Sequence, residues 1–315
     1  MDSPAGSIAP LAALVIASAL ACGPLKAAPE HDIEYLAEHL PEAAANHRLA
    51  SLPLWQPAPD ALGGALQVAY SRNAAEELAL SGPLAAIAAR YRLAPRWTVS
   101  AFGFYDRLRF SGEGDQRPLE VRFSRSVPLA LPAQASFASL GGRATIAGGG
   151  LALTRDIPRG WLKDWQVTVG VAAQRVSLRD YASAYRVLSG PSTGATGVVD
   201  YSADYNLLPG MLGLARRVDR GDWALVPHVL LVLPLARRGV RGRIAGPGFD
   251  VRGDTAEIGA GKHFGDPALA FGLDLESRQW GAWLDVGALL SQPLAEPAMH
   301  KGIDRSVLVS AGLRF

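Results

Sequence analysis

Large apolar and small or polar side chains alternate strictly along several segments of this chain. The segments 165–171 (WQVTVGV) and 269–276 (LAFGLDLE) repeat with a period of two residues. This period places Val169 on one face of a β-strand and Thr168 on the other. The second face carries charges together with Gly and Ala, a composition typical of the packed, wet interior of a membrane barrel. We therefore expect Val169 to face lipid and Thr168 to face a lumen.

Composition excludes two other classes of protein. After residue 21 the chain has no run of about 18 uncharged apolar residues, the length that a transmembrane helix needs, which excludes an α-helical membrane protein. The 31 basic and 29 acidic residues leave a net charge of only +2, so we expect no nucleic-acid partner. A soluble exported β-protein, whose apolar strand faces pack against a second sheet, stays open as an alternative.

The first residues have the pattern of an export signal. Residues 8–21 form an apolar core that ends in the small-residue triplet at 19–21, although Asp2 and no basic residue precedes it. We expect a cleaved signal peptide over 1–28. Cys22 is the only cysteine, which excludes an internal disulfide and leaves a lipoprotein anchor as a second interpretation of this region.

Residues 29–60 follow a different period from the rest of the chain. Apolar residues recur at helical spacing after Asp32, and the Pro-rich stretch 52–59 predicts an extended linker. A helix with acidic residues on its other faces suits an arginine-lined lumen better than a lipid surface. We expect it to plug the barrel, with Arg122 and Arg314 as candidate partners. The residues assigned to the plug helix are Ile33, Glu34, Leu36, Glu38 and Leu40.

Residues 61–315 are predicted to form the barrel domain, an all-β antiparallel meander of about twelve strands with a margin of two. The expected strands are 64–72, 82–93, 97–110, 117–126, 142–155, 165–179, 197–217, 223–236, 254–264, 268–277, 280–290 and 304–315. Long Gly/Pro/Ser-rich connections are expected at 181–196, 237–253 and 291–303. In this arrangement short and long connections do not alternate, which conflicts with the short periplasmic turns and long external loops of such barrels.

The last strand carries the most specific signal in the sequence. One face of it presents apolar residues only, and the chain ends on an aromatic ring. The residues of this face are Val307, Val309, Ala311, Leu313 and Phe315. This strand resembles the C-terminal strand of Gram-negative outer-membrane β-barrels. The resemblance implies an outer-membrane location, contact with outer-membrane lipid, and recognition of the strand by the barrel-assembly machinery.

About twelve strands preceded by a helical segment are similar to the translocator domain of autotransporters, whose pore holds an N-terminal helix. The resemblance implies a structural barrel or a narrow, plugged pore without enzymatic activity. Only about 30 residues separate the predicted signal from the barrel, too few for a secreted passenger, so the chain looks like a solitary barrel of this kind.

Searches for catalytic and metal-binding patterns gave no assignment. The segment 190–194 (GPSTG) matches a nucleophile elbow in letters, but a period-2 strand rather than a helix follows it. No histidine has a serine two residues on, the spacing found in lipid hydrolases of the outer membrane, so His228 and His263 are interpreted as ordinary strand residues. We expect no catalytic residues, no metal and no cofactor, and keep a lipid-modifying hydrolase as an alternative.

Four arginines between the eighth and ninth expected strands form a basic cluster without nearby acids. Guanidinium groups bind phosphates well, so the cluster is a candidate contact for lipopolysaccharide at the membrane rim; a solvated basic loop is the other interpretation. The residues are Arg237, Arg238, Arg241 and Arg243. Nothing in the sequence indicates an oligomeric state.

Overall fold

The computed structural model describes residues 46, 48–50, 52–55, 61–73, 79–111, 117–120, 134–158, 160, 162–189, 194, 196–246, 249–253, 267–291 and 304–315. Residues 46 and 48–50 are helical, and the other regular elements are strands. No helix in these ranges is long and apolar enough to cross a membrane.

The described chain folds into one antiparallel sheet. Its strands are β1 (Leu62–Asn73), β2 (Ala79–Ala94), β3 (Trp97–Ser111), β4 (Arg117–Glu120), β5 (Gln134–Asp156), β6 (Trp165–Ser189), β7 (Thr196–Arg216), β8 (Val218–Arg220), β9 (Trp223–Gly246), β10 (Phe249–Gly253), β11 (Ala268–Ser277), β12 (Ala282–Ser291) and β13 (Asp304–Arg314). The alternating sequence favours these strands because each can turn one apolar face outward and one mixed face inward.

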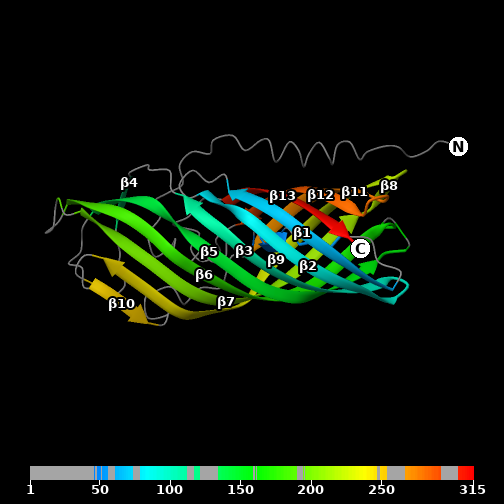
Figure 1. Cartoon of the computed structure of the whole chain (residues 1–315), viewed down its shortest axis with the longest axis horizontal. Coiled ribbons are helices and arrows are strands. Elements are labelled where there is room, and N and C mark those ends of the chain that lie inside the picture. Colours follow the sequence, from blue (N-terminus) through cyan, green and yellow to red (C-terminus); the bar gives the residue numbers. More distant parts are fainter. Residues whose placement is uncertain are drawn as a thin grey trace.

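The sheet closes on itself into a barrel, which is plain in Figure 1. The wall runs β1-β2-β3-β5-β6-β7-β9-β11-β12-β13, and β13 pairs again with β1. Ten strands therefore form the closed wall, within the predicted margin. Closure leaves the wall without an unpaired edge, as a lipid environment requires. The predicted all-β antiparallel barrel is confirmed.

One of the expected wall strands is not part of the closed wall where it is described. Residues 117–120 form β4, which pairs with the far end of β5, whereas 121–126 and the expected strand 254–264 lie outside the described residues. The strands β5, β6 and β9 extend well past their expected bounds, so much of 181–196 and 237–253, predicted as loops, is strand. Backbone hydrogen bonds between neighbouring strands sustain these extensions where the side-chain alternation has weakened.

With ten wall strands, the longest connections all lie at one end of the barrel. The connections β2–β3, β5–β6, β7–β9 and β11–β12 are short and lie at the same end of the barrel as Leu62 and Phe315. At the other end, the connections β3–β5, β9–β11 and β12–β13 span 22, 21 and 12 residues, and the first two include β4 and β10. The connections β1–β2 and β6–β7 at that end have only five and six residues. This is the asymmetry of outer-membrane barrels, with short turns on the periplasmic side and long loops outside.

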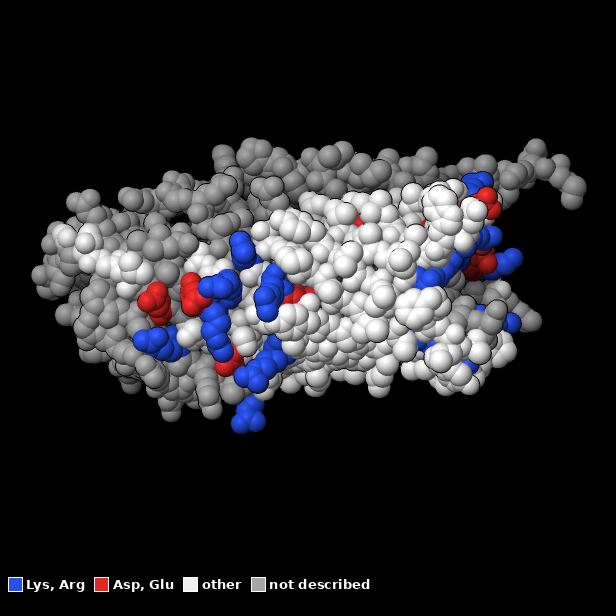
Figure 2. Space-filling model, in the orientation of Figure 1, with Lys and Arg blue, Asp and Glu red and all other residues white. Residues whose placement is uncertain are grey.

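The outer surface has a broad uncharged band. Figure 2 shows Lys, Arg, Asp and Glu gathered toward the two ends of the molecule, with uncharged surface between them. Val169 is 48% exposed on this surface whereas the neighbouring Thr168 is fully buried, so the predicted orientation of this strand is confirmed. The exposed apolar residues of the band include Leu66, Val68, Ile87, Leu151, Val169, Val171, Leu212, Leu284, Val286 and Val309.

Exposed aromatic residues flank this band. Trp223, Trp280 and Phe315 lie at the end with the short turns, and Tyr70 and Tyr105 lie toward the other end. The guanidinium of Arg107 lies over the ring of Tyr105, 5.7 Å from the ring centroid. Aromatic rings with one polar edge are typical of membrane–water interfaces. The band is therefore the lipid-facing surface of a transmembrane barrel.

Candidate functional site: the lumen and the segment inside it

Inward-facing side chains fill much of the lumen, and many of them are polar. Thr154 and Thr168 share a hydrogen bond of 2.8 Å between their hydroxyls, and Gln67 Nε2 donates to Ser310 Oγ at 3.0 Å. The buried polar and charged residues of the wall include Gln67, Arg90, Thr98, Ser100, Asp106, Thr154, Thr168, Gln174, His228, Asp274, Glu276, Asp285 and Ser310. A lumen of this kind is a polar core rather than a wide channel.

The described residues that precede β1 lie inside this lumen. Arg48 and Leu49 are fully buried, and Leu52, Leu54 and Trp55 are nearly so. Arg48 Nε donates to Asp106 Oδ2 at 2.7 Å, and its Nη2 donates to Asp106 Oδ1. Asp106 belongs to β3, between two residues whose side chains face outward, so its own side chain points into the barrel. The segment is therefore anchored to the inner wall by a buried ion pair.

Two further contacts join the segment to β2 and β3. The guanidinium of Arg48 lies 5.4 Å from the ring centroid of Phe104, close enough for a cation–π interaction. Arg90 Nη2 lies 3.5 Å from the carbonyl oxygen of Leu54, at the limit of a hydrogen bond. Phe104 belongs to β3 and Arg90 to β2, so this side of the wall contacts the segment both at Arg48 and at Leu54.

Trp55 contacts the opposite part of the ring. Its indole stacks on His228 of β9, with ring centroids 5.3 Å apart and planes 25° apart. Gly213 of β7 makes room for the indole, because a Cβ at this position would lie 2.1 Å from Trp55 Cη2. Residues 48–50 and 52–55 therefore contact β3 on one side of the lumen and β7 and β9 on the other.

Charged residues form a second network near the short turns. Glu276 accepts hydrogen bonds from Arg217 at 2.5 Å and from Arg314 at 3.4 Å. Arg217 also donates to Asp219 at 3.0 Å, and Arg278 forms an ion pair with Asp219. Burial alone would raise the pKa of Asp219, but the hydrogen bonds and positive charges of Arg278 and Arg217 outweigh it and hold that pKa below its ordinary value.

Three buried titratable side chains meet where Trp55 covers the wall. His228 of β9 lies between Asp274 of β11 and Asp285 of β12, with Nδ1 4.0 Å from Asp274 Oδ1 and Nε2 3.8 Å from Asp285 Oδ1. One nitrogen or oxygen from each of the three residues lies within 4.8 Å of the others. Among the described side-chain polar atoms, Asp285 Oδ1 is one of the few that are buried without a hydrogen-bond partner.

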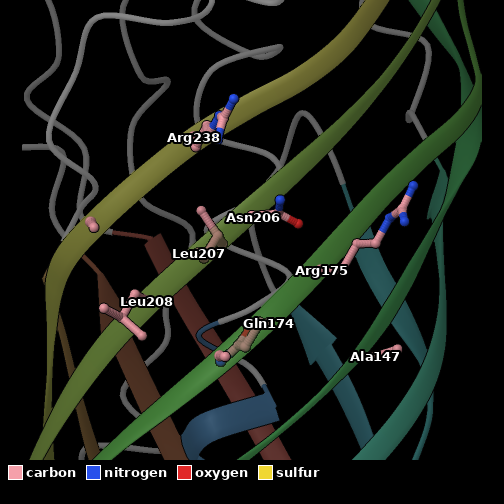
Figure 3. Close-up of a pocket in the computed structure, with 9 residues that line it drawn as sticks. Ala147, Gln174, Arg175, Asn206, Leu207, Leu208 and Arg238 are labelled. Carbon is pink, nitrogen blue, oxygen red and sulfur yellow. The ribbon is translucent and has the colours of Figure 1, made fainter.

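A pocket of about 490 Å³ lies on the wall where β6, β7 and β9 continue past the apolar band. Arg175, Asn206 and Arg238 form a cross-strand row beside it, as Figure 3 shows. Leu208 and small alanine side chains supply an apolar lining. Two guanidinium groups above an apolar surface offer a site for an amphiphile with an anionic head group.

The structure places the predicted site residues as follows. The apolar face of β13 is turned outward, with Val309, Leu313 and Phe315 exposed, whereas Leu308 and Ser310 are buried. The predicted plug helix residues Ile33, Glu34, Leu36, Glu38 and Leu40 lie outside the described residues, and so does the proposed partner Arg122.

Of the other arginines named from the sequence, the structure describes the side chains of only some. Arg314 is half-buried, and Glu276 of the wall is its acidic partner in the part of the chain that the structure describes. The four arginines of the basic cluster are all in β9 rather than in a loop. Arg238 lines the pocket of Figure 3, Arg243 is exposed, and the side chains of Arg237 and Arg241 lie outside the description.

Sequence analysis did not single out Arg48, Trp55, Asp106 or the cluster around His228. Each wall residue of this set occupies an inward-facing position of an alternating strand, so parity along the strand was an available signal. Their pairing was not available, because β9 lies beside β11, and Trp55 against β9, only through the order of strands in the closed wall.

Comparisons with known proteins concern the fold. No protein-family model matches the chain, and no curated protein sequence is similar to it. Among solved structures, the translocator domain of the autotransporter NalP from Neisseria meningitidis is 13% identical over 89% of this chain and 99% of that chain, with a TM-score of 0.37.

Two further solved structures are similar at the same level. The outer membrane protease OmpT from Escherichia coli is 9% identical over 82% of this chain and 97% of that chain, with a TM-score of 0.39. The toluene transporter TbuX from Ralstonia pickettii is 11% identical over 83% and 92%, with a TM-score of 0.38. Sequence identities and TM-scores this low do not assign the activity of any of these proteins to this chain. The closed wall, its lipid-facing band and the gathering of its longest connections at one end make this chain an outer-membrane β-barrel.

Proposed function

We propose that this protein is a non-enzymatic outer-membrane barrel whose narrow lumen is blocked by its own N-terminal segment, in the manner of an autotransporter translocator without a passenger. The observation that carries the proposal is the fully buried Arg48–Asp106 ion pair, which joins the segment to the inner wall. A charged pair inside the lumen is stable only while both partners are in place, so it favours one docked position of the segment.

The polarity of this contact is the reverse of the expected one. Acidic residues of the segment were expected to meet arginines of the wall, whereas in the described part the segment provides Arg48 and the wall provides Asp106. Asp106 also accepts a hydrogen bond from the backbone N–H of Ala85 at 2.9 Å, so the wall fixes the carboxylate independently of Arg48. A wall that orients its own anchor supports a built docking site for the segment.

The geometry does not favour a hydrolase. A serine nucleophile needs a histidine at hydrogen-bond distance. Among the described residues, Ser310 is beside Asp285 in the register and receives a hydrogen bond from Gln67, while His228 lies on the far side of Asp285. Trp55 covers His228 on the lumen side, which would also keep a lipid substrate from it.

Planar-bilayer recordings test the plug. The mature chain should show little conductance, and deletion of residues 30–55 should raise conductance clearly while the barrel keeps its heat-modifiable mobility on gels. The barrel wall does not depend on the segment for its backbone hydrogen bonds, so the truncated protein should still fold. Equal conductance of the two folded proteins would show that the segment does not close the lumen.

We also propose that the pocket beside Arg175 and Arg238 contacts the phosphates of lipopolysaccharide. Support comes from the row of two arginines over an apolar lining, at the boundary of the lipid-facing band. Changing both to Gln should weaken binding to lipid A vesicles about tenfold or more, relative to phosphatidylglycerol vesicles. Arg155→Gln, at the short-turn end where Arg155 stacks on Trp97, is the matched control. An equal loss in the control variant, or none in the double variant, would rule out this contact.

A further inference from the structure

The imidazole of His228 has a defined donor side and a defined acceptor side. Nδ1 lies 3.3 Å from the carbonyl oxygen of Val226, and because a carbonyl can only accept, Nδ1 is the protonated nitrogen in this contact. The neutral ring then has its lone pair on Nε2, which points toward Asp285 Oδ1 at 3.8 Å. Metal-binding histidines are commonly oriented in this way, with the second nitrogen donating to a backbone carbonyl.

Two acceptors therefore face each other with no donor between them. Asp285 Oδ1 is buried and has no hydrogen-bond partner among the described atoms, and Nε2 carries a lone pair. Asp274 adds a second buried carboxylate, directly across from Asp285 in the register of β11 and β12. No Lys or Arg in the described part of the chain forms an ion pair with either carboxylate. Arg217 acts on Asp274 only from beyond ion-pair distance, and Asp285 is hydrogen-bonded to Ser310 and to the backbone of Leu273. Two buried carboxylates that meet without an ion pair to Lys or Arg are still costly, so a positive charge between them would be stabilising.

The wall is shaped to leave space at this point. Gly272 is opposite His228 in the register, and a Cβ there would lie 2.3 Å from His228 Nε2 and 2.8 Å from Asp285 Oδ1. Any larger residue would occupy the space that borders both acceptor atoms. Trp55 closes the site from the lumen by stacking on the imidazole. The three ligands thus come from neighbouring strands of a rigid wall, and the plug segment covers them.

We propose that His228, Asp274 and Asp285 form a binding site for a divalent transition-metal ion inside the barrel. One imidazole and two carboxylates are a donor set that suits Zn²⁺, Mn²⁺ or Fe²⁺ better than soft ions. The ligand atoms lie within 4.8 Å of one another. Small side-chain rotations would place each of them at roughly 2.0–2.2 Å from a central Zn²⁺ ion. A doubly charged ion neutralises both carboxylates and joins β9, β11 and β12 beneath Trp55.

Zinc binding to the refolded full chain tests the site. After treatment with EDTA, equilibrium dialysis against Zn²⁺ followed by metal analysis should give one more tightly bound ion for the wild type than for His228→Gln or Asp285→Asn. His263→Gln is the control for binding to histidines elsewhere and should keep that ion. Equal Zn²⁺ content in the wild type and both site variants would overturn the proposal. Absence of tight binding throughout would overturn it too, leaving a shared proton as the charge between the carboxylates.

A second measurement does not depend on the folding of the site variants. Co²⁺ bound at this site would lie close to Trp55 and should quench part of the tryptophan fluorescence of the wild type. The quenched fraction should fall in Trp55→Phe, while Trp55→Ala should release Co²⁺ to EDTA faster because the cover is lost. Unchanged quenching in Trp55→Phe would place any bound metal elsewhere and reject the site. Because these readouts are metal content and fluorescence, they are independent of whether the segment blocks conductance.

Discussion

Arg48 and Asp106 form a two-point ion pair inside the barrel, with both side chains fully buried. The pair joins a segment that precedes the first strand to the middle of β3. Removing one partner of a buried pair costs about 3–5 kcal/mol, because the remaining charge keeps its desolvation penalty. We expect the segment, rather than the hydrogen-bonded wall, to respond by leaving the lumen.

We therefore expect Asp106→Asn to loosen the segment without unfolding the barrel. The variant should show higher conductance in planar bilayers and faster proteolysis of the region before β1, because the ion pair that joins Arg48 to β3 would be lost. Arg48→Gln should act in the same direction but less strongly, since Asp106 keeps the N–H of Ala85 as a donor. Asp204→Asn, which removes an ion pair with Arg179 away from the lumen, is the control. No change in Asp106→Asn would contradict the docking role of the pair.

The opposite faces of β6 should respond differently to substitution. Val169→Arg places a charge in the lipid-facing band and should lower the free energy of unfolding by about 2–4 kcal/mol. Thr168→Val removes one hydrogen bond to Thr154 but fits the same space, so it should cost only about 1 kcal/mol. Urea unfolding in lipid vesicles measures both, with Val169→Thr as the control for loss of apolar volume. Similar costs for Val169→Arg and Val169→Thr would contradict the lipid-facing assignment.

The last residue should matter for assembly because it closes the wall. Phe315 exchanges two backbone hydrogen bonds with Gly64, of 2.7 Å and 3.1 Å, and its ring lies where a Cβ on Gly64 would be. Deletion of Phe315, or Phe315→Asp, should lower outer-membrane levels and leave protease-sensitive chain in the periplasm. Phe315→Tyr keeps the ring and should assemble normally. Normal heat-modifiable mobility of the deletion and Asp variants would refute the recognition role of this strand.

The ion pairs of Asp219 should give a small, pH-dependent stabilisation. Because the folded-state pKa of Asp219 lies below its ordinary value of 3.8, the stabilisation is present above about pH 4 and is lost as the pH falls through the folded-state pKa. Asp219 is half exposed, so solvent screening limits the effect to about 0–1 kcal/mol. Asp219→Asn should be slightly less stable than the wild type at pH 7, and the difference should shrink as the pH falls below about 4, with Asp222→Asn as the control. A stability difference that grows toward low pH would contradict this assignment.

Patterns with a period of two residues were sufficient to predict the class of fold. The alternation in 165–171 predicted which side of β6 faces lipid, and the apolar face of 307–315 predicted the outward face of β13. Alternation is local, so it is readable in a single strand without knowledge of its neighbours. It does not report where a strand ends once the chain leaves the membrane, which is why β6 and β9 were predicted too short and β4 was counted in the wall.

The sequence by itself determined a membrane-spanning β-barrel, because apolar periodicity is a property of neighbouring residues. The tertiary structure alone decided that Asp106 receives Arg48, and that Trp55 meets His228 beside Asp274 and Asp285. These pairs are far apart in sequence and come together only when the ring of strands closes and fixes the register between them. The interactions in the lumen depend on that closure, because a polar side chain that is buried from water costs free energy unless it forms a hydrogen bond or an ion pair.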